Sequence, residues 1–309
     1  MKSVVTRFAP SPTGRLHLGH AYSAILAHDY ARERDGTFLL RIEDIDPGRS
    51  RGEFLNGIIE DVEWLGMMPD GEILSHSERL PLYAEALERL KASGLVYPCF
   101  CTRSAITAEI AASAAAPHGP EGPVYPGTCG RLSSDERKRR EGSEPHAWRL
   151  DMAAALAPLF PGEGRGPAGG GNLGPGLRRG TLSWRDGDTE VRAEPEQFGD
   201  VVLARKDAPV SYHLAVTVDD AAQNVSDVIR GRDLYAATHV HRLLQALLGL
   251  PSPRYHHHPL LLDAEGRRLA KRHGAPTIAG MRLAGVDPAK LAESLRTGQL
   301  PGGYSVSTS

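Results

Sequence analysis

The chain has 309 residues, 40% of them hydrophobic, and a formal net charge of −2 at pH 7. This length and hydrophobic content suffice for a sizeable core, and the charge excludes an overall basic field of the kind that announces a nucleic-acid partner, although local basic patches remain possible. There is no long apolar run, and residues 1–5 lack a signal-peptide core, so we expect a cytoplasmic protein without a membrane segment.

The first elements form a strand–helix–strand unit. Residues 3–8 are typical of a short buried strand, and a turn-rich loop follows at 9–14. Residues 18–34 have helical periodicity, the pair Asp35 and Gly36 ends that helix, and residues 37–42 are typical of a second strand. This order and spacing predict a right-handed βαβ unit and a parallel sheet.

The middle of the chain combines helices with an insertion. Residues 52–65 and 81–92 are two amphipathic helices, and residues 99–149 hold all three cysteines and form a small insertion. Within the insertion, residues 135–141 carry dense charge of both signs, which favours a solvated helix face. Residues 161–180 are rich in glycine and proline and are typical of a flexible surface linker.

The last third returns to alternating elements. Residues 201–205 and 213–218 are predicted as buried strands and 234–248 as a helix, and a short apolar strand at 259–262 leads into a basic loop. Two short helices and a loose tail complete the chain, at residues 278–283, 288–296 and 301–309.

The pattern predicts one α/β domain that is interrupted by an insertion and followed by a short helical part. We divide it into a first half of the catalytic domain at 1–98, an inserted subdomain with the linker at 99–195, a second half at 196–262, and a loop with a helical tail at 263–309.

The first chemical motif is residues 10–20, Pro-Ser-Pro-Thr-Gly-Arg-Leu-His-Leu-Gly-His, which join the first strand to the first helix. The start of a helix offers unpaired N–H groups and a positive dipole end, which suits a triphosphate. His17 and His20 point to the same side and can donate hydrogen bonds to phosphate oxygens, and Gly19 leaves room for a nucleotide ring. The alternative is that both histidines only cap the helix or lie on the surface.

This stretch resembles the His-Ile-Gly-His signature of class I aminoacyl-tRNA synthetases. Residues 7–14, Arg-Phe-Ala-Pro-Ser-Pro-Thr-Gly, and residues 40–46, Leu-Arg-Ile-Glu-Asp-Ile-Asp, are similar to the glutamyl branch of that family. The resemblance covers most of the chain outside the linker. It implies a Rossmann-type parallel-sheet catalytic domain in which Pro10, Gly19 and His20 contact ATP.

The second motif is the basic loop of residues 266–272, Gly-Arg-Arg-Leu-Ala-Lys-Arg. A mobile basic loop after a strand can clamp the pyrophosphate that leaves ATP, although such a loop alone is more often a solvated turn. It resembles the family's Lys-Met-Ser-Lys-Ser loop, with Lys271 on the second lysine. Arg268 replaces the first lysine and Ala270 the serine, so the charge is kept while the geometry and one hydroxyl change.

The third group of residues concerns an amino-acid substrate. Glutamate carries one ammonium and two carboxylates, so its pocket needs a carboxylate and at least one arginine. Arg7 and Glu43 stand at the ends of adjacent predicted strands, at the edge where open α/β sheets bind ligands. For each, the alternative is an ordinary salt bridge or a solvent contact.

Further pocket residues follow from the resemblance. Tyr212 and Arg230 match positions that contact glutamate in the family, which implies that Arg230 reads the side-chain carboxylate while Glu43 holds the ammonium. The same resemblance implies that the pocket is completed by the residues of the first strand and loop, Arg7, Phe8, Ala9, Pro10 and Ser11.

The three cysteines, Cys99, Cys101 and Cys129, all lie in the insertion. Three thiolates and one further ligand make the closed tetrahedral site that is usual for structural zinc, and a Cys-x-Cys pair can grip one metal from a tight turn. The alternative is three buried free thiols. A subfamily resemblance implies Tyr125 as the fourth ligand, and His118 is the competing candidate.

The run of His256, His257 and His258 invites a metal interpretation, which we reject. Neighbouring residues on a strand point to opposite faces, so three in succession rarely converge on one ion. We expect them to flank the strand before the basic loop.

A short helical tail without an anticodon-binding domain, together with the cysteine pattern, resembles the glutamyl-Q tRNA(Asp) synthetase family. That resemblance implies ATP-dependent activation of L-glutamate without tRNA, with Mg²⁺ accompanying ATP, followed by transfer of glutamate to queuosine in the anticodon loop of tRNA(Asp). We expect a monomer with one structural Zn²⁺.

Two alternatives stay open. The first is a short synthetase that charges the 3′ end of tRNA(Glu). The second, of another class, is a non-catalytic paralogue that binds tRNA or glutamate, for which the altered residues Arg268 and Ala270 are the sequence support. The RNA surface is not located by the sequence; residues 137–140 are a candidate, though charge runs are usually solvated faces.

Overall fold

The computed structural model describes residues 3–112, 118–157, 182–269, 276–300 and 304–307. Its strands are β1 (Val5–Phe8), β2 (Thr37–Ile42), β3 (Leu74–Ser75), β4 (Val96–Cys99), β5 (His118–Gly119), β6 (Gly122–Pro123), β7 (Ala147–Leu150), β8 (Ser183–Asp186), β9 (Thr189–Arg192), β10 (Val202–Ala204), β11 (Asp227–Gly231), β12 (Arg254–His258), β13 (Leu261–Leu262) and β14 (Ser305–Val306).

The helices are α1 (Leu18–Arg32), α2 (Gly52–Trp64), α3 (Leu80–Ala92), α4 (Arg103–Ala112), α5 (Ser134–Glu141), α6 (Met152–Leu156), α7 (Tyr212–Ala222), α8 (Ala237–Leu248), α9 (Ile278–Leu283) and α10 (Pro288–Thr297). Short 3₁₀ helices lie between them, η1 (His76–Glu78), η2 (Thr128–Arg131), η3 (Pro195–Phe198) and η4 (Arg232–Leu234). In the described part of the chain, none of the helices has both the length and the apolar character needed to traverse a lipid bilayer.

A parallel sheet organises the catalytic part. β2 pairs in parallel with β1 and β3, and β12 pairs in parallel with β11 and β8. The two groups meet where the Ser226 N–H donates to the Val5 carbonyl at 3.0 Å, so β1 lies beside β11. This confirms the predicted α/β class with a parallel sheet and the strand–helix–strand unit at its start.

The turn between α1 and β2 depends on a close approach of two backbones. Asp35 has φ +48°, and a Cβ on Gly36 would stand 2.5 Å from the Val4 carbonyl oxygen. Only glycine tolerates such proximity without a shift of the chain. The prediction that Asp35 and Gly36 end the helix is confirmed, and the close contact brings β1 and β2 into register.

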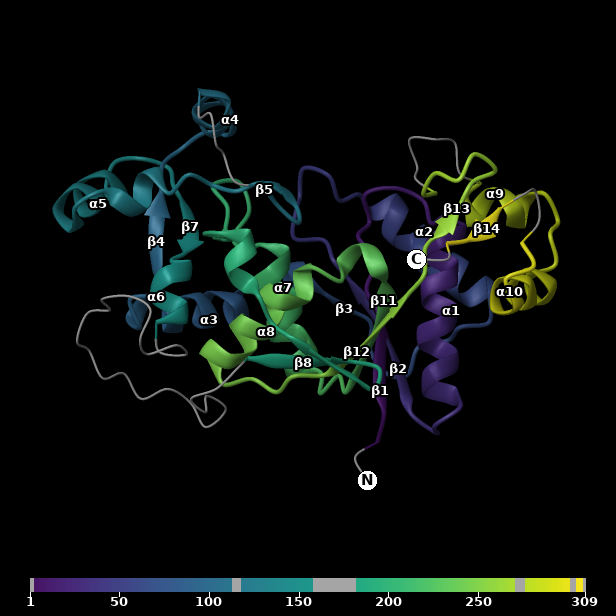
Figure 1. Ribbon diagram of the computed structural model, residues 1–309. Coiled ribbons are helices and arrows are strands. Elements are labelled where there is room, and N and C mark those ends of the chain that lie inside the picture. The colour runs from purple at the N-terminus through teal and green to yellow at the C-terminus, as the bar shows by residue number, and fades with distance from the viewer. Residues whose placement is uncertain (1–2, 113–117, 158–181, 270–275, 301–303, 308–309) are drawn as a thin grey trace.

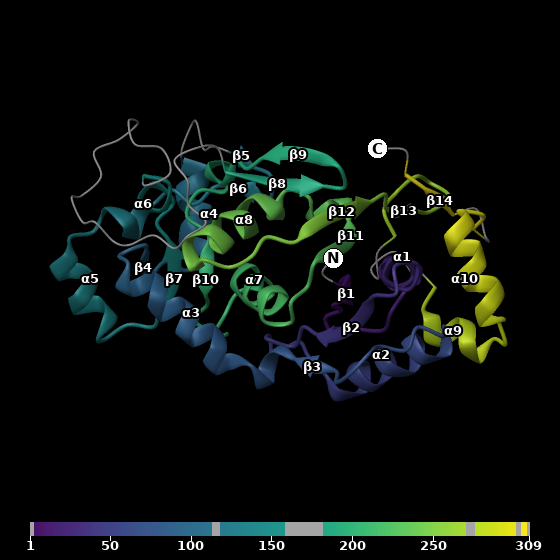
Figure 2. The ribbon, with the colours of Figure 1, turned by 90° about the horizontal axis from the view of Figure 1, so that it is seen from below.

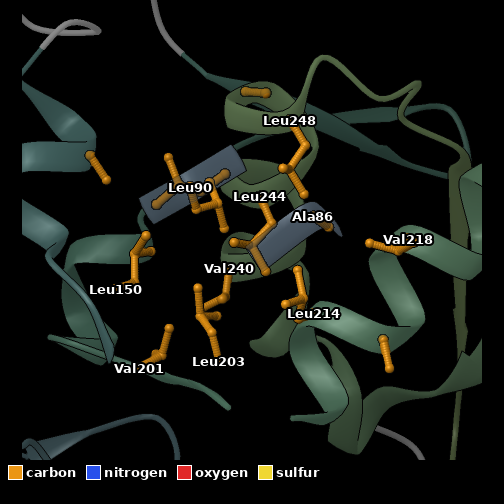
Figure 3. Packing of buried hydrophobic residues seen from close by; sticks show 14 of the residues in the cluster. Ala86, Leu90, Leu150, Val201, Leu203, Leu214, Val218, Val240, Leu244 and Leu248 are labelled. Atoms are coloured by element: carbon orange, nitrogen blue, oxygen red, sulfur yellow. The ribbon is translucent and has the colours of Figure 1, made fainter. Parts of the chain in front are cut away.

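Two hydrophobic clusters flank the sheet. One joins α3, α7 and α8 to β10 and includes Leu90, Leu214 and Leu244, which point toward one another in Figure 3. The other packs α1 against β1, β2 and the C-terminal helices. Both views of the molecule place the insertion with β4, β7 and α5 at one end and α9 and α10 at the other (Figures 1 and 2). The catalytic sheet therefore lies between two appended parts.

One predicted strand is wrong. Residues 213–218 belong to helix α7, in which every residue from Leu214 to Asp220 is buried. A helix that is buried on all sides shows no polar face, and its apolar run contains the β-branched Val216 and Thr217. Length and periodicity could not separate it from a buried strand.

One smaller expectation is confirmed and another is wrong. Residues 256–258 directly precede β13, the short strand before the basic loop, and they also form the end of β12, the partner of β11. Part of the expected loose tail is ordered, because β14 pairs with β13, Leu261 opposite Val306. The linker prediction for 161–180 falls outside the described residues.

Candidate active site

The predicted site residues surround one hollow of about 510 Å³. Its lining includes the end of β1, the loop after it, the first turn of α1, and the start of the basic loop. The predicted residues that line it are Arg7, Phe8, Ala9, Pro10, Ser11, His17, Gly19, His20, Glu43, Tyr212, Arg230 and Arg268. The structure thus brings together every predicted ATP and glutamate residue that it describes.

The first turn of α1 is closed by its own histidines. The His17 imidazole accepts a hydrogen bond from the Gly19 N–H at 3.1 Å, and Nδ1 of His20 accepts one from the His17 N–H at 3.2 Å. Since both Nδ1 atoms accept, each neutral ring carries its proton on Nε2. The two rings lie 3.8 Å apart between centroids. Both histidines therefore cap the helix and also line the hollow. A capping role and a role in binding phosphate are compatible.

Gly19 serves this arrangement directly. A Cβ at position 19 would lie 3.1 Å from Cε1 of His17, tighter than ordinary packing allows. The expectation was that Gly19 makes room for a nucleotide. The structure adds a second reason for a glycine at this position: any side chain here would collide with the His17 imidazole that caps the helix.

Glu43 lines the hollow and belongs to a network of buried charge. Its carboxylate is 3.8 Å from Nη2 of Arg41, whose side chain is fully buried. Asp220 accepts from Nη2 of Arg41 at 2.9 Å and from Nε of Arg7 at 3.0 Å. Burial raises the pKa of Glu43 to about 7, although the nearby Arg41 and Arg7 oppose the shift. An ammonium group bound at Glu43 would favour its charged form.

A buried carboxylate pair was missed by sequence reasoning. Asp219 and Asp220 lie on α7, and Asp219 accepts from Nε of Arg79 at 2.7 Å and from the hydroxyl of Tyr83 at 2.6 Å. Two adjacent acids directly after an apolar run are the available signal. The strand predicted at 213–218 ends before both acids, and only the helix α7 carries them into the buried interior.

Arg230, which also lines the hollow, is 4% exposed and lies near the end of β11, beside Tyr212 at the start of α7. Nη1 of Arg230 lies 3.4 Å from the Tyr212 hydroxyl. Among the residues that the structure describes, no carboxylate is within ion-pair distance of Arg230. A buried cation without an internal counter-ion is suited to an anionic ligand.

The basic loop reaches the hollow through Arg268. Its guanidinium forms a 2.6 Å ion pair with Asp233, and both residues line the cavity. Lys271 and Ala270 lie outside the described residues. The loop is anchored on either side, by the Leu269 N–H to the Leu261 carbonyl at 3.0 Å and by the Ile278 N–H to the Leu16 carbonyl at 2.9 Å.

The insertion gathers the three cysteines as predicted. The sulfur atoms of Cys99, Cys101 and Cys129 all lie within 4.8 Å of one another. The Tyr125 hydroxyl is 3.4 Å from the sulfurs of Cys99 and Cys101. A tetrahedral zinc site with bonds near 2.3 Å places sulfur atoms about 3.8 Å apart, so this donor set fits a metal ion. The side chain of His118, the competing ligand, lies outside the described residues.

A second hollow of about 720 Å³ adjoins the first. The side chain of Tyr212 lines both hollows and lies at their boundary. The insertion forms one wall through Cys101 and Tyr125, and four basic residues contribute to the lining, Arg103, Arg149, Arg205 and Lys206.

An α/β sheet with paired histidines at a helix start, a buried carboxylate and an unneutralised arginine defines the class of enzymes that activate a carboxylic acid with a nucleotide. The chain matches the family described as tRNA synthetases class I (E and Q), catalytic domain, over residues 3–157 and 179–299. It therefore belongs to this family, and two of the relatives below that match over nearly their whole length are glutamyl-Q tRNA(Asp) synthetases.

It is 49% identical to the glutamyl-Q tRNA(Asp) synthetase of Rhodobacter capsulatus, over 93% of this chain and 98% of that protein. It is 42% identical to the protein of that name from Deinococcus radiodurans, over 98% and 92% of the two chains. The glutamate–tRNA ligase of Aquifex aeolicus is 35% identical over 94% of this chain but only 56% of its own length.

The fold is similar to a solved structure, a glutamate tRNA ligase from Elizabethkingia meningosepticum in complex with its amino acid. The TM-score is 0.75 at 26% identity, covering 96% of this chain and 61% of that one. The similarity in fold extends over nearly the whole chain.

Proposed function

We propose that this protein activates L-glutamate with ATP to give glutamyl-adenylate, without tRNA, and transfers the glutamate to queuosine in the anticodon loop of tRNA(Asp). The observation that carries the proposal is that Glu43 and Arg230 line the same hollow. A carboxylate for the ammonium and a buried, unneutralised cation for the side-chain carboxylate are complementary to an acidic amino acid.

Activation needs no side-chain nucleophile. An oxygen of the glutamate α-carboxylate attacks the α-phosphorus, a new P–O bond forms, and the bond to the β-phosphate breaks to release pyrophosphate. The protein contributes position and charge. His17 and His20, held as Nε2–H tautomers by their capping bonds, donate to phosphate oxygens. Lys271 and Arg268 clamp the leaving pyrophosphate, and Mg²⁺ bound with ATP offsets phosphate charge.

The insertion binds one structural Zn²⁺ through Cys99, Cys101, Cys129 and Tyr125. Support comes from the mutual closeness of the donors and from the Phe100 N–H, which donates to the Cys129 sulfur at 3.3 Å as expected beside a thiolate. The ion ties β4 to η2 and so fixes one wall of the second hollow.

Transfer to the queuosine nucleoside is supported by the similarity to glutamyl-Q tRNA(Asp) synthetases over nearly their whole length. The second hollow offers room for an accepting nucleoside next to the adenylate, with basic side chains for the RNA backbone. The enzyme acts in the cytoplasm as a monomer. Charging of the tRNA(Glu) 3′ end is the competing reaction, and the comparisons favour it less because the glutamate–tRNA ligases are 37% and 35% identical to this chain, whereas the two glutamyl-Q tRNA(Asp) synthetases are 49% and 42% identical.

The experiment uses labelled glutamate and three RNAs, tRNA(Asp) with queuosine, the same tRNA without that modification, and tRNA(Glu). Labelling of only the first, unaffected by removal of the 3′-terminal adenosine of the RNA, is the expected result. Labelling of tRNA(Glu), or loss of all labelling after that removal, would establish the competing reaction instead.

A further inference from the structure

Arg230 is held by uncharged side chains on every described side. Its Nε donates to Nε2 of His257 at 3.1 Å, and Nη2 donates to the Thr238 hydroxyl at 2.6 Å. Nη1 lies 3.4 Å from the Tyr212 hydroxyl and 3.4 Å from Nδ1 of His241. The partners fix the guanidinium in place and leave its charge for a ligand.

The direction of these bonds determines the proton on His257. An arginine N–H can only donate, so Nε2 of His257 must accept and its proton must be on Nδ1. That Nδ1–H lies 3.0 Å from a carboxylate oxygen of Asp186, and the same oxygen accepts from the His257 backbone N–H at 3.1 Å. A continuous chain therefore runs from Asp186 through His257 to Arg230.

The hydrogen-bonded chain is sheltered and spans three strands. The His257 side chain is fully buried and that of Asp186 is 20% exposed. Asp186 ends β8 and His257 lies in β12, which pairs with both β8 and the strand of Arg230. Burial and the neighbouring Arg230 lower the pKa of His257 to about 3, so the imidazole stays neutral near pH 7.

Placing an imidazole between the acid and the arginine has a specific consequence. A carboxylate bonded directly to Arg230 would neutralise it and compete with an acidic ligand, as Asp220 does for Arg7. The neutral ring of His257 accepts the hydrogen bond that orients Arg230. The same ring separates the Asp186 carboxylate from the guanidinium. The guanidinium thus remains both aligned and cationic.

We infer that Asp186 and His257 are positioning residues that hold Arg230 for a side-chain carboxylate and so set the preference for glutamate over glutamine. The inference rests on the proposed function, because it takes Arg230 as the group that reads the end of the substrate. Glutamine has nearly the same shape as glutamate, so selection between them depends on charge and on the angle of the guanidinium.

The test measures equilibrium binding of L-glutamate and L-glutamine by calorimetry, so that it does not depend on catalysis. His257→Leu removes the acceptor for Nε while keeping an apolar volume, and Asp186→Ala removes the group that sets the tautomer. Both should lower the ratio of glutamate to glutamine affinity by at least about tenfold, the value of a lost hydrogen bond to a charged group. Binding of ATP should not change.

Two further variants separate positioning from damage to the fold. His257→Gln can present an amide oxygen near the site of Nε2 and should restore most of the ratio. Asp188→Ala, in the same turn but 99% exposed, should leave the ratio at the wild-type value. The inference would be overturned if His257→Leu and Asp186→Ala left the ratio of glutamate to glutamine affinity unchanged, including the case in which both affinities fall by the same factor. Failure of the wild type to exchange pyrophosphate would instead count against the proposed function.

Discussion

Asp220 joins Arg7 to Arg41 through a single oxygen, at 3.0 Å from Nε of one and 2.9 Å from Nη2 of the other. All three side chains are buried, and Glu43 lies beside them. One acid from α7 thus bridges two arginines, from β1 and β2, and its single negative charge offsets one of their two positive charges. The carboxylate of Glu43, 3.8 Å from Nη2 of Arg41, is the second acid beside the pair.

The first prediction concerns this acid. Asp220→Ala leaves two buried cations without the carboxylate that bridges them, which costs about 3–5 kcal/mol of unfolding free energy. Urea unfolding followed by circular dichroism measures the loss. Glu33→Ala is the control, since Glu33 pairs with Arg34 on the surface and should change stability by about 0–1 kcal/mol. If Asp220→Ala and Glu33→Ala lowered the free energy of unfolding by the same small amount, the structural role of Asp220 would be contradicted.

The second prediction is a pH dependence of glutamate binding. Burial raises the pKa of Glu43 to about 7, and the ligand ammonium needs the ionised carboxylate. Below pH 7 a proton must leave before binding, so affinity should fall about tenfold for each unit of decreasing pH and level off above pH 7. The neighbouring Arg41 and Asp220 keep their charges over this range, because the pKa of Arg41 is raised and that of Asp220 is lowered.

Calorimetric titrations from pH 5.5 to 8.5 measure that profile. Glu43→Gln should bind glutamate at least about 100-fold more weakly, with the slope near pH 7 absent. An affinity that is independent of pH below 7 in the wild type would show that Glu43 does not hold the ammonium.

The third prediction concerns metal. Atomic emission should find one zinc per chain, and removal by a chelator should lower the melting temperature by at least about 5 °C, because the ion closes the insertion. Cys129→Ser should bind substoichiometric zinc and melt early without chelator. A zinc-free protein that melts at the same temperature as the loaded one would leave the cysteines as free thiols.

The fourth prediction concerns the basic loop. Lys271→Ala should reduce adenylate formation by about 100-fold or more while the melting temperature stays the same, since the residue acts on the leaving pyrophosphate. Arg267→Ala is the matched control in the same loop, because Arg267 is exposed and paired with Asp263 and Glu265. Comparable losses in the two variants would mean that general loop charge, and not Lys271, carries the effect.

Local signals predicted much of the fold. Helix α1 and strand β2 follow the predicted bounds closely because a glycine turn and clear periodicity mark them. Helix α7 was missed because it is buried on every side and shows no amphipathic pattern.

The residues of the candidate site also fall into those that local sequence motifs predict and those that they do not. His17, His20, Arg7 and Glu43 lie in short strings whose chemistry can be judged in isolation. Asp220 and His257 act through partners about two hundred and about thirty residues away, Arg7 and Arg230. Residues that far apart form no local sequence pattern. These contacts could therefore be identified only from the three-dimensional structure.

The most direct test of the account is glutamate-dependent exchange of labelled pyrophosphate into ATP by zinc-loaded protein in the absence of any tRNA. We predict exchange with L-glutamate, and much weaker exchange with L-glutamine and L-aspartate. No exchange with glutamate under these conditions would contradict the assignment and would make the chain a non-catalytic binding protein.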